Sequence, residues 1–539
     1  MCESRTIELK NTLREVSALN ITSSFQVRIV NCSVNLNDTV RIYQGALSYL
    51  IGIVNENWDA VKSITTGALE QRRYIEKLVH GNKNREAKYP EFDKKFRKYP
   101  SYLRRATITA AIGAVSSSRS NLANWENTDK QTAAPTLQID RKAFPTFFRD
   151  DMFEVEGAPE KVKVPKNPKA KDKLTPEEKK IEKEKHQAAQ LKNSQNEITA
   201  LNDKHTVHLK VYHKSDWVWA TVTLRKTDIA YLRKYWMHAC ASAPVLEKRF
   251  GKYSLRFSFE ENISLSKTPI KKQRICAVDL GLNTDATCCI MTADGTILAR
   301  KFINFASDKD HLYHVLNRIK KFQRLHGSRE AHNFWAYAKR INDELSKKIA
   351  SAIVEFAVLY SADVIVFEHL DFKGKKASSK KQKIQMWRKN GIQHIAEHKA
   401  HRCGIRISHI CAWGTSKLAF DGSGKVTRAQ NNHSLASFES GKQYNADLNA
   451  CYNIGARYFI REVTKPMSKK AWSQCKAKVP DIERRTQCTL YSLKQLHSLL
   501  SPPMATQQPG PICWDYTVLR ELCGRLTPMW RPMPSGIVS

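Results

Sequence analysis

Three acidic residues lie where metal-dependent chemistry would need them. Asp279 ends the apolar run Ile-Cys-Ala-Val, Glu368 follows the run Val-Ile-Val-Phe, and Asp447 falls in the first turn of an expected helix. Each acid alone has an ordinary explanation: Asp279 could cap a turn, Glu368 could pair with a lysine, and Asp447 could favour the helix dipole. Together they indicate a metal site, because carboxylates held close together repel one another unless cations lie between them.

Two Mg²⁺ ions about 4 Å apart can activate a water molecule and stabilise the leaving oxygen in phosphodiester cleavage. Mn²⁺ can substitute for Mg²⁺ in a site built from carboxylate oxygens. The sequence therefore predicts a magnesium-dependent endonuclease site. Asp279, Glu368 and Asp447 are its expected catalytic residues and metal ligands.

The segments around these acids alternate between strand-like and helical patterns. Apolar runs predict strands at 275–279, 287–291, 297–303 and 363–370. Asp294 and Gly295 form a hairpin turn between the second and third runs, because both residues tolerate positive φ. Apolar residues at three- and four-residue spacing from Ile341 to Tyr360 predict a helix with one face on the sheet. An acid-bearing strand followed by a hairpin is typical of an RNase H-like sheet.

The chain is long and strongly basic. Its 539 residues exceed one ordinary domain, and an apolar content of 41% suffices for sizeable cores. Lys and Arg number 89 against 52 Asp and Glu, which gives a formal net charge of +37. So large an excess of one sign indicates a nucleic-acid partner, because each neutralised phosphate releases counterions.

Other classes are disfavoured by composition. No run approaches the ~20 uninterrupted apolar residues of a membrane span, and the first ten residues lack the basic start and apolar run of a secretion signal. We therefore expect no membrane partner and a cytoplasmic location, in a prokaryotic cytosol. The 13 cysteines include no CxxC pair, which argues against both a disulfide framework and an obvious zinc ribbon.

The first half of the chain is typical of a β unit interrupted by helices. Residues 24–33 alternate like a strand, and helical spacing begins near Asn37. Strand-like runs return at 206–212, 217–224 and 253–259. The economical arrangement is a small β-barrel that is split by a helical lobe.

The helical lobe interleaves Lys and Arg with aromatic residues. Tyr102, Arg104 and Arg105 are candidates for nucleic-acid contacts, although a solvated helix face would have the same composition. Residues 156–196 contain almost no large apolar side chains and are dense in Lys, Glu and Pro. Such a segment buries too little surface to offset ordering entropy, so we expect a mobile insertion or a bare charged helix.

Three short blocks resemble the RuvC motifs of transposon-encoded TnpB proteins and of compact type V CRISPR effectors, the Cas-twelve nucleases. They are Val-Asp-Leu-Gly at 278–281, Phe-Glu-His-Leu at 367–370 and Ala-Asp-Leu-Asn-Ala at 446–450. The resemblance covers about residues 270 to 460. Supporting residues follow in the order of that family, beginning with Trp387 and Arg388, which we also take as nucleic-acid candidates, and ending with Trp-Gly-Thr-Ser-Lys at 413–417.

The resemblance implies a RuvC-type endonuclease with guide RNA and double-stranded target DNA as partners. The guide would pair with target DNA next to a short flanking motif. The implied fold is multi-domain α+β: a split oligonucleotide-binding-like β-barrel, or wedge, with an inserted helical recognition lobe, followed by an RNase H-like (RuvC) α/β domain. The length of 539 residues exceeds that of a typical TnpB protein and is small for a CRISPR effector. Between the two we expect a compact CRISPR effector.

The expected divisions follow from this fold and from the patterns above. They are 1–35 (first part of the wedge), 36–155 (recognition lobe), 156–204 (charged flexible insertion), 205–270 (remainder of the wedge), 271–412 (nuclease domain with the first two acids), 413–442 (target-strand loading loop), 443–465 (helix of the third acid) and 466–539 (C-terminal tail of unknown role).

One departure from the family concerns zinc. Relatives usually carry a four-cysteine zinc ribbon before the third acid. The aligned positions here are Ala419, Gly422, Ser437 and Ser440. These four residues cannot hold zinc tetrahedrally, so we expect no zinc and a metal-free hairpin or loop in this place.

Two alternative functions remain open from the sequence. One is an RNA-guided DNA-binding protein that represses or recruits with weak or no cleavage. The other is a guide-independent RNase H-fold enzyme such as a junction resolvase or a transposase. The long basic region before Asp279 exceeds what a resolvase needs, which favours the RNA-guided interpretation. The sequence leaves open the origin and architecture of the guide, the flanking motif, a nick versus a double-strand break, and the oligomeric state.

Overall fold

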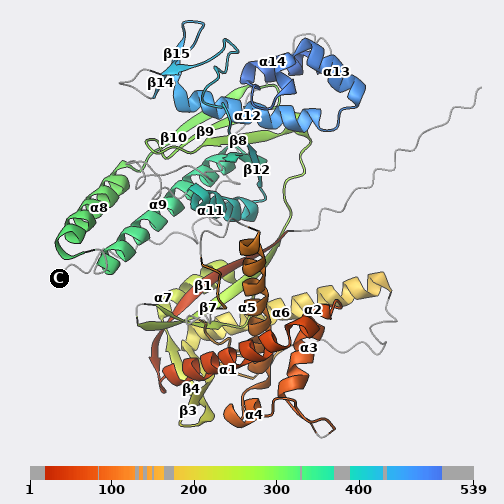
Figure 1. Ribbon diagram of the computed structural model, residues 1–539, viewed down its shortest axis with the longest axis vertical. Coiled ribbons are helices and arrows are strands. Elements are labelled where there is room, and N and C mark those ends of the chain that lie inside the picture. The colour runs from red at the N-terminus through yellow and green to blue at the C-terminus, as the bar shows by residue number, and fades with distance from the viewer. Residues whose placement is uncertain are drawn as a thin grey trace, which may run out of the picture. The chain divides into compact units, whose positions relative to one another are not determined.

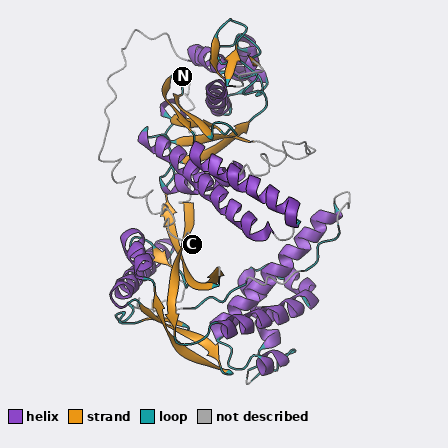
Figure 2. Cartoon of the chain, turned by 90° about the vertical axis from the view of Figure 1, so that its left-hand side faces the viewer, coloured by secondary structure: helices purple, strands orange, loops and turns teal. Residues whose placement is uncertain are grey.

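The computed structural model describes residues 19–82, 84–127, 133–137, 143–148, 151–162, 175–249, 251–327, 331–369, 389–428 and 434–500. The chain divides into two compact units, residues 22–261 and residues 262 onward, with the first 21 residues grouped with the second. We call them the N-terminal unit and the C-terminal unit and treat each by itself (Figure 1, Figure 2). Among the described residues, no helix combines the length and apolar character of a membrane span.

A seven-stranded sheet forms the centre of the N-terminal unit. Its strands are β1 (Leu19–Cys32), β2 (Phe153–Val155), β3 (Thr206–His213), β4 (Asp216–Leu224), β5 (Cys240–Ala241), β6 (Val245–Arg249) and β7 (Lys252–Ile263). The order is β2-β3-β4-β1-β7-β5, and β6 also pairs with β7. Because β1 precedes the helices and lies between strands that follow them, the prediction of an interrupted β unit is confirmed.

The helices between β1 and β2 pack against one another and share a core with the sheet. They are α1 (Asn37–Glu56), α2 (Trp58–Ser63), α3 (Ala68–Val79), α4 (Glu91–Lys95) and α5 (Ser101–Glu126). Phe92, Phe96 and Tyr99 pack ring against ring and join α4 to the start of α5. At the far end of the range assigned to this lobe, residues 153–155 form β2 and pair with β3. The boundary at residue 155 therefore lies inside the sheet.

The expected charged insertion is more ordered than predicted. Residues 175–204 form α6 (Pro176–Lys204), which begins with a reciprocal capping box between Thr175 and Glu178. Its last turns bury Ile198 and Leu201 in the core of the unit, close to α7 (Lys226–Trp236). Of the two predicted alternatives, the charged helix is therefore found over residues 176–204, and a few apolar residues dock its last turns. Residues 163–174 lie outside the described residues.

The C-terminal unit is built on a five-stranded mixed sheet. Its strands are β8 (Arg274–Asp279), β9 (Ala286–Thr292), β10 (Ile297–Ile303), β11 (Val364–His369) and β12 (Arg406–Cys411), in the order β10-β9-β8-β11-β12. The first three strands pair antiparallel, whereas β8, β11 and β12 pair parallel. The four strands predicted from the apolar runs are all present.

Helices cover both faces of this sheet (Figure 1). They are α8 (Ala306–His326), α9 (His332–Leu359), α11 (Lys389–Arg402), α12 (Ala446–Thr464), α13 (Lys469–Lys478) and α14 (Leu490–Leu500). Ala277 and Val366 face the core under α12, whereas Val278 and Phe367 face the core under α9. Each strand therefore alternates between two buried faces, as period-two side chains require.

Helix α12 comes unusually close to the sheet at Gly455. A Cβ there would lie 2.8 Å from Cε of Met291 and 3.4 Å from Cβ of Ala277. Helix α12 therefore packs closely on β8 and β9 at this residue.

Residues 466–500 are not a tail. Cys475 of α13, Ile482 of the short helix η4 (Pro480–Glu483) and Leu493 of α14 lie in the same core as α12. These segments extend the unit that contains the three acids. Residues 501–539 lie outside the described residues.

Candidate active site

Asp279 and Glu368 lie at the same end of neighbouring parallel strands. Val278 of β8 is paired in register with Phe367 of β11, so the next residue on each strand is one of the two acids. Asp279 is two positions after Ala277, and Glu368 is two positions after Val366. Both carboxylates therefore face the side of the sheet that α12 covers.

Asp447 reaches this end of the sheet from the first turn of α12. The side chain of Asn445 caps the helix, because its Oδ1 accepts from the backbone N–H groups of Asp447 and Leu448 at 3.0 Å. Further along α12, Cys451 Sγ lies 3.1 Å from the carbonyl oxygen of Ala277 and donates to it. Cap and contact together place the start of α12 over β8.

The pKa of the Asp279 carboxyl depends on the charges of the two other acids. Burial raises the pKa of the Asp279 carboxyl well above its usual range, and the negative charges of Glu368 and Asp447 raise it further. Arg428 acts in the opposite sense on the same pKa. The structure thus brings together the three acids that were singled out from the sequence. The positive charge of the Arg428 side chain also acts on Asp279.

Arg428 was not identified from the sequence. It lies on β13 (Thr427–Arg428), which pairs with β14 (Leu435–Ser437), and β14 pairs in turn with β15 (Gln443–Asn445). Nothing in the local sequence distinguishes Arg428 from the many other cations of this chain. Only the fold of the hairpin brings its charge close to Asp279.

Glu368 is held by its neighbours. Its side chain is 8% exposed, and Thr415 Oγ1 donates to Glu368 Oε1 at 2.5 Å. The side-chain amide of Gln393 donates to the Glu368 carbonyl at 3.0 Å. One carboxylate oxygen therefore has a fixed hydrogen-bond donor in the segment that follows β12.

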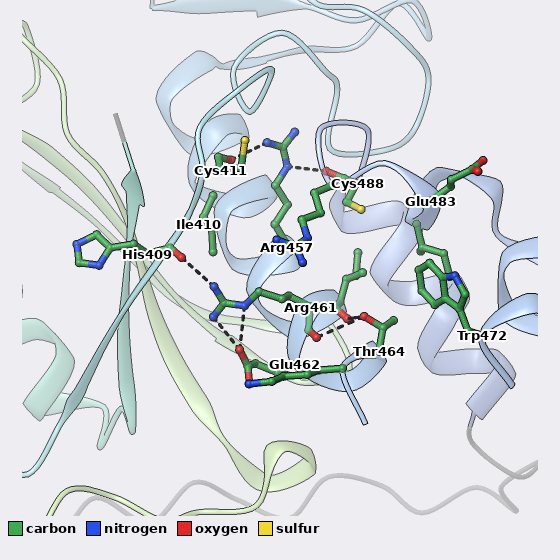
Figure 3. Close-up of a pocket in the computed structure, with 14 residues that line it drawn as sticks. His409, Ile410, Cys411, Arg457, Arg461, Glu462, Thr464, Trp472, Glu483 and Cys488 are labelled. Carbon is green, nitrogen blue, oxygen red and sulfur yellow. Dashed lines mark hydrogen bonds and ion pairs between the residues drawn. The ribbon is translucent and has the colours of Figure 1, made fainter. Parts of the chain in front are cut away.

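A buried arginine, Arg457, donates hydrogen bonds to the backbone of the segment that follows β12 (Figure 3). Arg457 of α12 donates to the backbone carbonyls of Cys411, Trp413, Thr486 and Cys488 at 2.8–3.1 Å. Burial lowers the pKa of its guanidinium, while Cys488, Cys411 and Glu368 act in the opposite sense. Arg457 thus ties the end of β12 to the segment before α14.

Arg461, one turn further along α12, donates to the carbonyl of His409 at 2.8 Å. Arg457 and Arg461 are thus four residues apart on the helix, and the carbonyls of Cys411 and His409 are two residues apart on β12. The two spacings match, at about 6 Å on a helix and about 6.6 Å on a strand. Both arginines line a cavity of about 740 Å³ between β12, α12 and α13 (Figure 3), and both are already hydrogen-bonded.

The donor set of Asp279, Glu368 and Asp447 fits Mg²⁺. All three supply carboxylate oxygens, the ligands that this hard cation prefers. Burial raises the pKa of Asp279, and repulsion from Glu368 and Asp447 raises it further. Across the described ranges, no three His, Cys, Asp or Glu side chains surround one point closely enough to hold an ion. A bound cation would draw the carboxylates together, since it removes the repulsion between them.

The four positions aligned with the zinc ribbon lie in and beside the β13–β14–β15 sheet. Ala419 is buried, and the ring of Tyr491 lies so close to Gly422 that a Cβ there would be 2.5 Å from it. Ser440 Oγ donates to Asp421 Oδ2 at 3.1 Å, which joins the two loops by a polar contact. A hairpin or a loop was predicted here, and antiparallel strands are found. The absence of zinc stays a prediction.

Replacing Asp421 with asparagine should destabilise this hairpin in a pH-dependent way. Burial alone would raise the pKa of the Asp421 carboxyl, but hydrogen bonds from Ser423 and Ser440 and the charge of Lys442 outweigh it and hold the pKa below its usual range. The carboxyl therefore binds protons less readily in the folded state. Its stabilising effect should be constant from about pH 7 to about pH 5 and decline below that.

Thermal midpoints of the wild type and Asp421→Asn at pH 7, 5 and 4 measure this effect. The difference between the two proteins should shrink at pH 4. Ser440→Ala, which removes one donor and keeps the carboxylate, should lie between them at pH 7. A difference that grows as the pH falls would contradict the assignment.

The nucleic-acid candidates of the helical lobe differ in their solvent exposure and ion pairing. Arg104 is 7% exposed and lies 3.5 Å from Glu76 and 3.9 Å from Asp93, which explains it as a structural cation. Tyr102 is 52% exposed, and the guanidinium of Arg105 lies 5.7 Å from its ring centre. Arg105 Nε also donates to Glu76 Oε1 at 3.1 Å, so its guanidinium is ion-paired like that of Arg104, whereas Tyr102 remains a candidate. Trp387 and Arg388 lie outside the described residues.

Comparison with known proteins gives three results. No curated protein sequence matches the chain. A family profile described as the Aq_aa04 family matches residues 23–166, which begin in β1 and end beyond β2. A search of solved structures also finds similar chains.

Three of these structures illustrate the likeness. A Cas12f1 in complex with sgRNA and target DNA is 13% identical, with a TM-score of 0.44 over 81% of this chain and 98% of that one. The mini-RNA-guided endonuclease CRISPR-Cas phi3 is 11% identical, with a TM-score of 0.45 over 81% and 92%. CasPhi-2 (Cas12j) bound to crRNA and phosphorothioate-DNA is 10% identical, with a TM-score of 0.42 over 81% and 91%.

Proposed function

We propose that this chain is an RNA-guided DNA endonuclease with a single RuvC-type, magnesium-dependent site. The observation that carries the proposal is the in-register pairing of Val278 with Phe367, which puts Asp279 and Glu368 at the same end of neighbouring parallel strands; burial and the charges of Glu368 and Asp447 together raise the pKa of Asp279. Three separate elements, β8, β11 and α12, supply these acids at one end of the sheet. Three antiparallel strands followed by two parallel ones are the arrangement expected of an RNase H-like domain.

The three carboxylates would hold the metal, and their surroundings would orient them. Bound there, Mg²⁺ supplies an activated water and stabilises the leaving oxygen of the scissile phosphate. Thr415 would orient the Glu368 carboxylate through its hydrogen bond to Oε1. The charge of Arg428 acts on Asp279, so this guanidinium would also attract the phosphate.

Guide and target would be held mainly by phosphate contacts. The net charge of +37 suits a polyanion of this size. The interrupted sheet of the N-terminal unit is compatible with a split oligonucleotide-binding-like wedge, and α1 to α5 would form the recognition lobe. The exposed ring of Tyr102 would serve there, beside the partly buried guanidinium of Arg105.

The decisive experiment starts from the RNA that co-purifies with the full chain. That RNA is sequenced, and a duplex matching its guide portion is presented beside randomised flanking sequences, with Mg²⁺ or with EDTA. We expect magnesium-dependent cleavage that requires both the RNA and a short flanking motif. Binding without cleavage would favour an RNA-guided binder, and cleavage without RNA would favour a guide-independent nuclease.

Replacing Arg428 with alanine should slow cleavage about 10- to 100-fold, because a cation beside the developing phosphate charge contributes about 1.4–2.7 kcal/mol on this scale. Guided DNA binding should change little. Single-turnover cleavage of bound target measures the effect. Lys425→Ala, on the same hairpin but not among the groups that shift the pKa of Asp279, is the matched control. Equal rates for the two variants would remove Arg428 from the site.

A further inference from the structure

The segment from Trp413 to Lys417 exposes an aromatic ring beside the candidate active site. It follows β12, whose last residue, Cys411, pairs in register with His369 of β11, the residue after Glu368. Two residues further along, the side chain of Trp413 is 70% exposed. The ring therefore lies at the end of the sheet at which the acids gather.

The backbone on both sides of this ring is fixed. Arg457 Nη1 donates to the Trp413 carbonyl at 2.8 Å, and the side-chain amide of Asn453 donates to the Thr415 carbonyl at 3.0 Å. Thr415 also donates to Glu368. A ring that projects into solvent from a backbone tied to the acid-bearing strand is preorganised relative to the site.

The ammonium group of Lys417 lies near the Trp413 ring. Lys417 Nζ lies 5.6 Å from the centre of the Trp413 ring, within the range of a cation–π contact. A single exposed tryptophan is common on protein surfaces. Here, however, the ring, the ammonium group and the link through Thr415 to Glu368 occur within five residues. An aromatic face next to a positive charge is the combination that binds an unpaired nucleotide.

We propose that Trp413 and Lys417 form a substrate platform on which one base of the DNA strand to be cut stacks while its phosphate contacts the ammonium group. The inference rests on the proposed nuclease function and adds a positioning element to it. The base must be unpaired, because the ring can stack only on an exposed base face. Every base has such a face, so the platform should tolerate all four.

The test uses the full chain with its co-purified RNA, on an Asp279→Ala background so that the target stays intact. 2-Aminopurine is placed at successive positions of the target strand, and its fluorescence reports stacking. We expect quenching at one or two adjacent positions. Adding Trp413→Ala should restore the fluorescence there, and Trp413→Phe should keep most of the quenching.

Cleavage supplies the second measurement, with Asp279 intact. Trp413→Ala should reduce the single-turnover rate of bound target about 10-fold, Lys417→Ala should reduce it less, and Trp413→Phe should stay near the wild type, since stacking contributes about 1–3 kcal/mol per base. Tyr313→Ala is the matched control, because this ring of α8 is 54% exposed in the same unit. It should behave like the wild type.

The outcomes separate the two proposals. If Asp279→Ala cuts like the wild type, the nuclease assignment itself fails. If Asp279→Ala is inactive while Trp413→Ala matches Tyr313→Ala in both fluorescence and rate, only the platform is overturned. A change in oligomeric state on Trp413→Ala without a change in fluorescence would assign the ring to a contact between copies and would also overturn it.

Discussion

Replacing Asp279 with alanine should abolish DNA cleavage while leaving RNA-guided DNA binding nearly unchanged. The carboxylate is the group on which Glu368 and Asp447 act, so its loss removes the member at the centre of the proposed metal site. A metal that stabilises transition-state charge contributes several kcal/mol, and about 4 kcal/mol corresponds to a rate loss of about a thousandfold. Binding rests on phosphate contacts elsewhere and should survive.

Single-turnover cleavage and a gel-shift assay measure the two properties on the same preparation. Glu368→Gln and Asp447→Ala should behave like Asp279→Ala, because each removes a ligand of the same site. Asp294→Asn is the matched control, since this acid lies in the turn between β9 and β10, where Thr292 and Thr296 donate to its side chain. Residual cutting by Asp279→Ala near the wild-type rate would refute the assignment.

Metal binding provides a check that does not depend on activity. If the carboxylates hold Mg²⁺, adding Mg²⁺ should raise the thermal midpoint of the wild type, because a ligand at about 100 times its dissociation constant stabilises the folded state by about 2.7 kcal/mol. Asp279→Ala should lose this increase. An equal increase in both proteins would place the bound cation elsewhere.

Replacing Arg457 with alanine should cause the largest loss of stability among the variants considered. The side chain donates to four backbone carbonyls and is 4% exposed, so its removal leaves buried acceptors without donors. Each unsatisfied buried group costs about 1–3 kcal/mol. We expect the free energy of unfolding to fall by at least about 3 kcal/mol.

Urea unfolding, followed by hydrogen exchange at β12, measures this loss. Arg457→Lys should not restore stability, because a compact ammonium group cannot reproduce the planar fork that reaches carbonyls on both sides. Arg461→Ala is the matched control: its side chain is only partly buried, so the loss should stay near 1 kcal/mol. Cleavage by Arg457→Ala should also slow, since Thr415 and Trp413 lose their anchor. A stability loss no greater than that of Arg461→Ala would contradict the role.

Local patterns in the sequence predicted the elements that carry the acids. The predicted bounds of the strands that end near Asp279 and Glu368, and of the helix that begins near Asp447, are correct to within a few residues. Repeats of two and of 3.6 residues each reflect a single strand or helix, so they can be recognised locally. The hairpin at Asp294 and Gly295 could also be predicted from adjacent residues alone. The helical part of the charged insertion was harder, because the docking of α6 depends on only a few residues such as Ile198 and Leu201.

The sequence also contained a signal that was passed over. Leu490, Leu493 and Leu496 recur at helical spacing and lie in the core shared with α12. That pattern predicts α14, yet the segment was assigned to a tail because no resemblance extends so far along the chain. Helical periodicity was sufficient evidence here without a resemblance.

The register of β8 and β11 and the position of Arg428 depend on contacts between residues far apart in the chain. The sequence around Val278 does not indicate that Phe367 is its partner in the sheet. The sequence around Arg428 likewise does not indicate that its charge acts on Asp279. The kinds of element and the chemical types at the site follow from short-range periodicity and residue chemistry. Which side chains meet is set by long-range packing, such as the close approach of α12 at Gly455, because that free energy arises only when distant segments bury one another.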